Sequence, residues 1–176
     1  MASKKTAPFM LTERITLPTA GARVSATIDL GSYVDVGDRQ AIMIHKVDFI
    51  YQGTTASESL GATFGAGAET ITQVLDLNRG GFSFANDRAM IAGGRLIYSA
   101  PDGPVSNEAD LYPDNFGKGA LDGRIVVNDT LYLESIVDTL AAAKSLNVTV
   151  QVTASIVTLS QKDFMAIAIQ STAADN

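Results

Sequence analysis

The clearest pattern in this chain is an alternation of apolar or small residues with polar ones along 146–159, LNVTVQVTASIVTL. Because successive side chains of a β-strand point to opposite faces, this period of two predicts a strand with one buried and one polar face. At about 3.3 Å per residue, such a strand spans roughly 45 Å, which is longer than most strands. Strands of this length are typical of large sandwiches and barrels, many of which assemble.

A second strong strand is predicted over residues 40–51. Both sets of alternate residues are apolar at its start, so we expect it in the middle of a sheet or beneath another element. Met43, Val47 and Phe49 have the same parity along this strand. We therefore expect all three to share one buried face, opposite the apolar residues of the longer strand.

The remaining strands are shorter and are separated by turn and loop signals. They are predicted over 11–17, 24–30, 33–36, 70–77, 95–99, 124–127 and 130–137. Long loops are expected at 53–68 and 101–123, and residues 82–91 have no clear period. About eight strands with no helices between them predict an all-β fold, an antiparallel β-sandwich of jelly-roll type. We expect residues 1–10 to be a tail and residues 11–176 to form one domain.

The C-terminal segment has a different character and predicts a short helix over about 161–171. Ser160 is a suitable N-cap, and the negative charge of Asp163 favours the first turn of a helix. Its apolar residues cover more than one stripe, so the helix needs a groove of its own domain or a neighbouring subunit to bury them. The candidate assembly contacts on this helix are Phe164, Met165, Ile167 and Ile169.

The composition narrows the range of partners. Charged residues make up only 18% of the chain, against about 25% for typical soluble domains, which suits a protein packed against copies of itself. A large core that dilutes the charge explains the same number equally well. The net charge is −6, and the only basic cluster is Lys4-Lys5, so we expect no direct contact with nucleic acid. The chain has no cysteine and therefore neither disulfides nor thiolate metal sites.

Residues suited to catalysis are scattered. The single histidine, His45, lies among apolar neighbours, and one histidine cannot supply the several ligands of a metal-binding jelly roll. Carboxylates that could pair for glycoside chemistry, or hold calcium in the 101–123 loop, follow no recognised spacing. The candidates for these two roles are Asp48, Glu69, Asp76, Asp87, Asp102, Glu108, Asp110, Asp114 and Glu134. We therefore expect no enzyme, no catalytic residue, no metal, no cofactor and no small-molecule substrate.

Three stretches taken together, 29–52, 123–135 and 146–171, resemble single jelly-roll viral capsid proteins. The order of a strand, a short turn, a long strand, then late paired strands and a terminal helix is similar to small major capsid proteins of archaeal and bacterial icosahedral viruses that contain a membrane. The resemblance covers about half of the chain and includes no diagnostic motif. It implies a virion protein, made in the host cytoplasm, that assembles with copies of itself into an icosahedral shell. A second capsid protein and an underlying membrane layer are further partners that the resemblance leaves open.

Two other classes of protein also agree with the sequence. A carbohydrate- or receptor-binding sandwich would use exposed aromatic residues of the 101–123 loop, where Tyr112 and Phe116 are candidate contacts. A subunit of a phage tail, tube or filament would pair its long strand across subunits.

Overall fold

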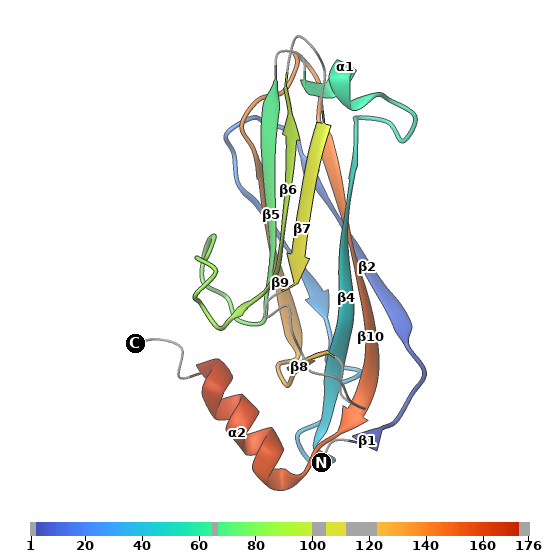
Figure 1. The fold of residues 1–176 in the computed structure, drawn as a ribbon, viewed down its shortest axis with the longest axis vertical. Coiled ribbons are helices and arrows are strands. Elements are labelled where there is room, and N and C mark those ends of the chain that lie inside the picture. Colours follow the sequence, from blue (N-terminus) through green and yellow to red (C-terminus); the bar gives the residue numbers. More distant parts are fainter. Residues whose placement is uncertain (1–2, 65–66, 100–104, 112–122, 173–176) are drawn as a thin grey trace.

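The computed structural model describes residues 3–64, 67–99, 105–111 and 123–172. Two antiparallel sheets lie face to face and form an elongated sandwich (Figure 1). Two helices lie near its opposite ends, α1 (Leu60–Phe64) and α2 (Gln161–Thr172).

Sheet A is built around the longest strands of the chain. Strand β10 (Leu146–Thr158) lies between β4 (Gln40–Gln52) and β2 (Phe9–Leu17). The short strand β8 (Arg124–Val126) extends the sheet beyond β4, and the two-residue β1 (Ser3–Lys4) pairs with the end of β10. The segment expected to be a tail therefore lies partly along β10, and Phe9 and Met10 already belong to β2.

Sheet B has the strand order β3-β9-β5-β6-β7. Its strands are β3 (Val24–Asp29), β9 (Thr130–Val137), β5 (Ala68–Leu75), β6 (Met90–Tyr98) and β7 (Val105–Leu111). Four neighbouring strands of sheet A, in the order β2-β10-β4-β8, thus face four strands of sheet B, in the order β3-β9-β5-β6. Along the chain, strands β2 to β5 and then β8 to β10 belong alternately to one sheet and the other. This is the connectivity of a jelly roll, so the predicted fold class is confirmed. Strands β1 and β7 are additions at the sheet edges.

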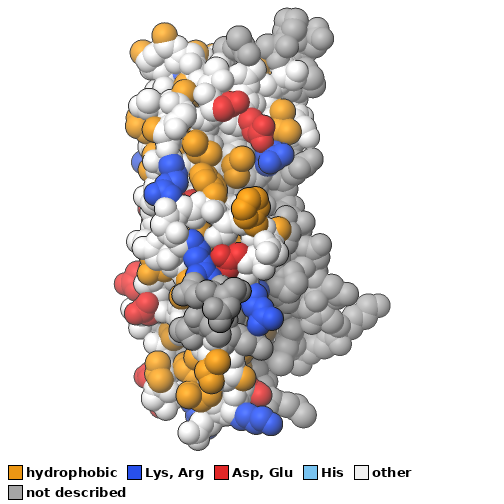
Figure 2. Space-filling model, turned by 90° about the vertical axis from the view of Figure 1, so that its left-hand side faces the viewer, with side chains coloured by type: hydrophobic (Ala, Val, Ile, Leu, Met, Phe, Trp, Pro, Cys, Tyr) orange, Lys and Arg blue, Asp and Glu red, His pale blue; other side chains and the backbone are white. Residues whose placement is uncertain are grey.

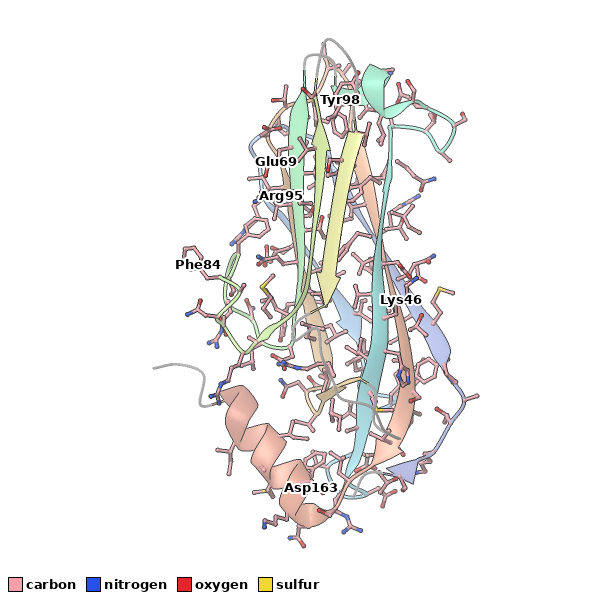
Figure 3. All side chains as sticks on the ribbon, in the orientation of Figure 1. Lys46, Glu69, Phe84, Arg95, Tyr98 and Asp163 are labelled. Atoms are coloured by element: carbon pink, nitrogen blue, oxygen red, sulfur yellow. The ribbon has the colours of Figure 1, made fainter. Side chains whose placement is uncertain are left out.

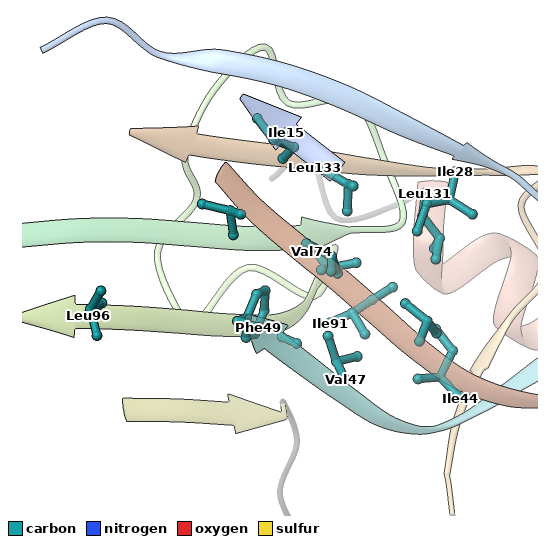
Figure 4. Packing of buried hydrophobic residues seen from close by; sticks show 14 of the residues in the cluster. Ile15, Ile28, Ile44, Val47, Phe49, Val74, Ile91, Leu96, Leu131 and Leu133 are labelled. Carbon is teal, nitrogen blue, oxygen red and sulfur yellow. The ribbon is translucent and has the colours of Figure 1, made fainter. Parts of the chain in front are cut away.

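The core lies between the sheets and follows the alternation of β10. Val148, Val150 and Val152 are fully buried and belong to one hydrophobic cluster with residues from both sheets. Figure 4 shows members of this cluster, among them Val47 of sheet A and Val74 of sheet B.

Gly94 on β6 allows the Phe49 ring of the facing sheet to approach the β6 backbone closely. A Cβ built on Gly94 would lie 2.5 Å from a ring carbon of Phe49, so the ring occupies space that only glycine leaves free.

A β-bulge in β4 changes which side chains of this strand face the core, so part of the prediction for this strand needs correction. Thr153 pairs with Lys46 and Ala154 with Ile44, so His45 is the extra residue that the register between β4 and β10 skips. Because of this extra residue, odd-numbered side chains of β4 face the core after the bulge, whereas even-numbered ones face it before the bulge. Val47 and Phe49 face the core as predicted, but Met43 does not share their face, and the prediction for Met43 is wrong.

Met43 is nevertheless buried, because α2 covers the outward side of sheet A near the start of β4. Ile42 and Ile44 belong to the main core, whereas Ala41 and Met43 point the opposite way and form a second hydrophobic cluster with Phe164 of α2. The start of β4 is therefore apolar on both faces because it lies mid-sheet and beneath a helix, as expected.

Four predicted assignments are wrong. Residues 105–111 are not loop, because β7 pairs with β6 along its whole length, and an edge strand needs only one neighbour for its backbone. Strand β6 begins at Met90 rather than at residue 95, and the two glycines in its middle hide the pattern. Residues 33–36 form a turn in which the Tyr33 N–H donates to the Leu30 carbonyl, rather than a strand. The expected loop at 53–68 also contains α1.

Candidate assembly surface

Helix α2 begins where the sequence predicts. The Asp163 N–H donates to Ser160 Oγ at 3.2 Å, and the Phe164 N–H donates to the Ser160 carbonyl at 2.9 Å. These bonds satisfy donors that the first turn of a helix leaves without intrahelical partners. A hydrogen bond with the Ser160 side chain lowers the pKa of the Asp163 carboxyl, and this favours a charge that suits a helix N-terminus.

The two faces of α2 have different environments. Phe164 is only 5% exposed and packs with the outward-facing residues of sheet A, and Ile167 contacts the same cluster. Met165 and Ile169 lie on the other side of the helix and are 53% and 58% exposed. Of the four candidate contacts on the helix, Phe164 and Ile167 are therefore used within the domain, and Met165 and Ile169 are available to a neighbour.

The other two candidate contacts, Tyr112 and Phe116, lie outside the described residues.

A second exposed apolar site lies in the loop between β5 and β6, a stretch whose sequence has no clear period. In the part of this connection that spans residues 78–89, Phe82 is 38% exposed and Phe84 is 87% exposed. We refer to it as the phenylalanine loop. Figure 3 shows Phe84 pointing away from both sheets. Two phenylalanines two residues apart in a glycine-rich segment without period are the signal that could have identified the loop.

Polar contacts hold the phenylalanine loop against the outward side of sheet B. The Gln73 side-chain amide of β5 donates to the Ser83 carbonyl and accepts from the Ser83 N–H, both at 2.9 Å. Arg79 forms a two-pronged ion pair with Asp87, with distances of 3.0 and 3.1 Å. These contacts fix the position of the loop backbone, and the exposed Phe84 side chain projects from it.

A further contact joins the loop to the edge of sheet B. Arg23 donates to the Gly80 carbonyl and lies 3.4 Å from Glu134 of β9, which also accepts from Ser25 at 2.7 Å. Glu134 is only 4% exposed, so its charge is balanced within the domain.

Asp76, next to the loop, is as deeply buried as Glu134, at 4% exposed. Burial raises the pKa of its carboxyl, and Arg124 of β8, 3.5 Å away, opposes that rise. Arg124 also donates to the Arg88 carbonyl of the phenylalanine loop. The loop is thereby linked to strand β8 of the opposite sheet.

Most of the residues considered for catalysis lie apart from one another, although the charge of Asp87 is near enough to Asp76 to raise the pKa of that carboxyl. His45 Nε2 lies 2.8 Å from the hydroxyl of the buried Ser155. Five of the carboxylates each form an ion pair with a different basic side chain; they are Asp48, Glu69, Asp76, Asp87 and Glu134. Asp102 and Asp114 lie outside the described residues, and of Glu108 and Asp110 only the backbone, in β7, is described. Among the described residues, no group of three His, Cys, Asp or Glu is placed to hold a metal.

Nor does the described part of the chain contain a helix with the length and hydropathy to cross a membrane.

Comparison with known proteins adds only a weak likeness to solved structures. No known family model matches the chain, and no curated protein matches its sequence. A solved structure named for Desmodium yellow mottle tymovirus is similar with a TM-score of 0.32 and 6% sequence identity, over 89% of this chain and 92% of that chain. A likeness at this level carries no argument about function.

Proposed function

We propose that this chain is a non-enzymatic structural subunit of a viral capsid and assembles with copies of itself. The observation that carries the proposal is the pair of outward apolar sites, Met165 and Ile169 on α2 and Phe84 on the phenylalanine loop. Met and aromatic side chains are enriched in surfaces that a partner covers, and the side chains of all three residues are more than half exposed. Jelly rolls are also a common architecture of capsid proteins.

The low content of charged residues supports the same proposal. Figure 2 views the side on which α2 and the phenylalanine loop lie in Figure 1, and hydrophobic side chains are exposed at its lower end and along its middle. Acidic and basic side chains lie among these apolar groups. Such a mixture is typical of the surfaces between subunits that fold first and associate afterwards. In this proposal residues 11–176 act as one unit, and the protein is part of the virion.

The test compares the assembly state of the full chain with that of two variants. Size-exclusion chromatography with light scattering and electron microscopy should show capsomers or closed shells for the wild type. Met165→Gln together with Ile169→Gln should shift the protein towards monomer without changing its thermal unfolding, because both side chains are exposed in the single copy. Lys162→Gln, an exposed position on the same helix, is the matched control and should assemble normally.

Other outcomes would contradict the proposal. A wild-type chain that stays monomeric at all concentrations would favour a binding module, and open tubes would favour a tail or filament subunit. Normal assembly of the double variant would remove α2 from the contact. Turnover of a small substrate that survives repurification and is lost in His45→Ala would show an enzyme.

A further inference from the structure

A cleft lies beside the phenylalanine loop, on the outward side of sheet B. It has a volume of about 490 Å³, and its walls come from the turn after β3, the end of β5 and the link between β8 and β9. Val34, Val36, Leu77 and Tyr132 form the apolar part of its lining, beside polar residues such as Asn128 and Thr130. A second hollow of about 450 Å³ shares Tyr132, so we refer to the first as the Tyr132 cleft.

The charges of the loop and the cleft are opposite. Asp76 and Asp129 line the Tyr132 cleft, and Asp129 is exposed, whereas no Lys or Arg is among its described lining residues. The phenylalanine loop carries Arg88, an exposed cation four residues after Phe84. Since Asp76 is buried and already paired with Arg124, a ring and a guanidinium group on one element match apolar residues and the exposed Asp129 carboxylate on the other.

Phe84 does not fill the Tyr132 cleft of its own chain. The bonds of Gln73 to Ser83 and the Arg79–Asp87 ion pair hold the loop in a position that leaves Phe84 87% exposed. A loop backbone held in this way is preorganised for another molecule, because little backbone freedom is lost on binding.

We propose that Phe84 of one copy inserts into the Tyr132 cleft of a second copy, and that the contact is reciprocal. Loop and cleft lie on the same side of the molecule, since Leu77 lines the cleft and the next residue begins the loop. A two-fold axis through this side brings each loop to the other copy's cleft, which makes the surface self-complementary. Arg88 then approaches Asp129 of the second copy. This inference rests on the proposed self-assembly and names one contact within it.

The first test replaces the ring. Phe84→Ala should weaken association at least tenfold in sedimentation equilibrium while leaving thermal unfolding unchanged, because the side chain makes few contacts within its own domain. Phe82→Ala, in the same loop but only 38% exposed, is the matched control and should weaken association much less. Equal effects of the two variants would overturn the assignment of Phe84 as the inserted ring.

The second test reverses the charges across the contact. Arg88→Glu and Asp129→Lys should each weaken association, and the chain that carries both changes should recover most of it, because the pairing is restored with opposite polarity. Recovery in the double variant supports the contact, and its absence would show that the loop docks elsewhere.

These results separate the inference from the proposed function. Normal assembly of Phe84→Ala, combined with loss of assembly in the α2 double variant, would overturn the loop-to-cleft contact and leave the structural role intact. A wild-type chain that never associates would overturn both.

Discussion

Helix α2 and the phenylalanine loop both cover an outward sheet face and both leave apolar side chains exposed, but different forces hold them. The inward side of α2 is apolar, with Phe164 packed against Met43 and Ala41. The loop is held mainly by hydrogen bonds and ion pairs around Gln73 and Asp87. Hydrophobic contact depends on buried area, whereas polar contacts depend on geometry and ionisation. The two elements should therefore respond differently to substitution and to pH.

The largest effect is expected on the inward face of α2. Phe164→Ala should lower the free energy of unfolding by about 3 kcal/mol, because the ring is buried and its loss leaves a cavity. Met165→Ala, the next residue along, should change it by less than about 0.5 kcal/mol. Urea unfolding followed by circular dichroism measures both values. Similar losses in the two variants would mean that the helix has no preferred inward side.

A smaller effect is expected where polar contacts hold the loop. Gln73→Ala removes both bonds to Ser83 and should cost about 1–3 kcal/mol. It should also make the phenylalanine loop an early site of limited proteolysis, while α2 remains protected. Gln151→Ala, on the outward side of β10, is the matched control. Unchanged cleavage in Gln73→Ala would show that the ion pair of Asp87 is sufficient to hold the loop.

The smallest effect is expected from pH, and it should arise at the loop. Burial raises the pKa of Asp76, so ionisation of this group opposes folding, and its contribution to the free energy of unfolding should increase as the pH falls from 7 towards 3.8. The pKa of Asp87 is lowered by bonds to the Ala89 N–H and Arg79, which outweigh its partial burial, so its stabilising contribution is lost only below about pH 3.8.

Asp76→Asn isolates the Asp76 contribution. The free energy of unfolding of this variant relative to wild type should be most favourable at pH 7 and should decline towards pH 4, measured by urea unfolding at each pH. The opposite trend would show that the attraction of Arg124 outweighs the burial of Asp76.

Much of the fold follows from local pattern, and the candidate surface follows only in part. The alternation over 146–159 predicted β10 and its buried valines, and Ser160 predicted the start of α2. The apolar residues of α2 were identified, but their division into inward and outward sides was not, because nearly every side of the helix is apolar. Phe84 was missed, because its exposure depends on contacts with Gln73, which lies ten residues before Ser83.

The sequence by itself determined where the chain is extended and which strand faces are apolar, because the period of a strand is a local property of the backbone. Tertiary structure decided the bulge at His45, the edge strand over residues 105–111 and the space that Gly94 leaves for Phe49. The bulge and the Gly94 contact depend on partners that lie far away along the chain, and the edge strand depends on its pairing with the preceding strand, β6. The same reason explains why a phenylalanine in an irregular loop becomes a candidate contact: residues of another strand hold the backbone that exposes it.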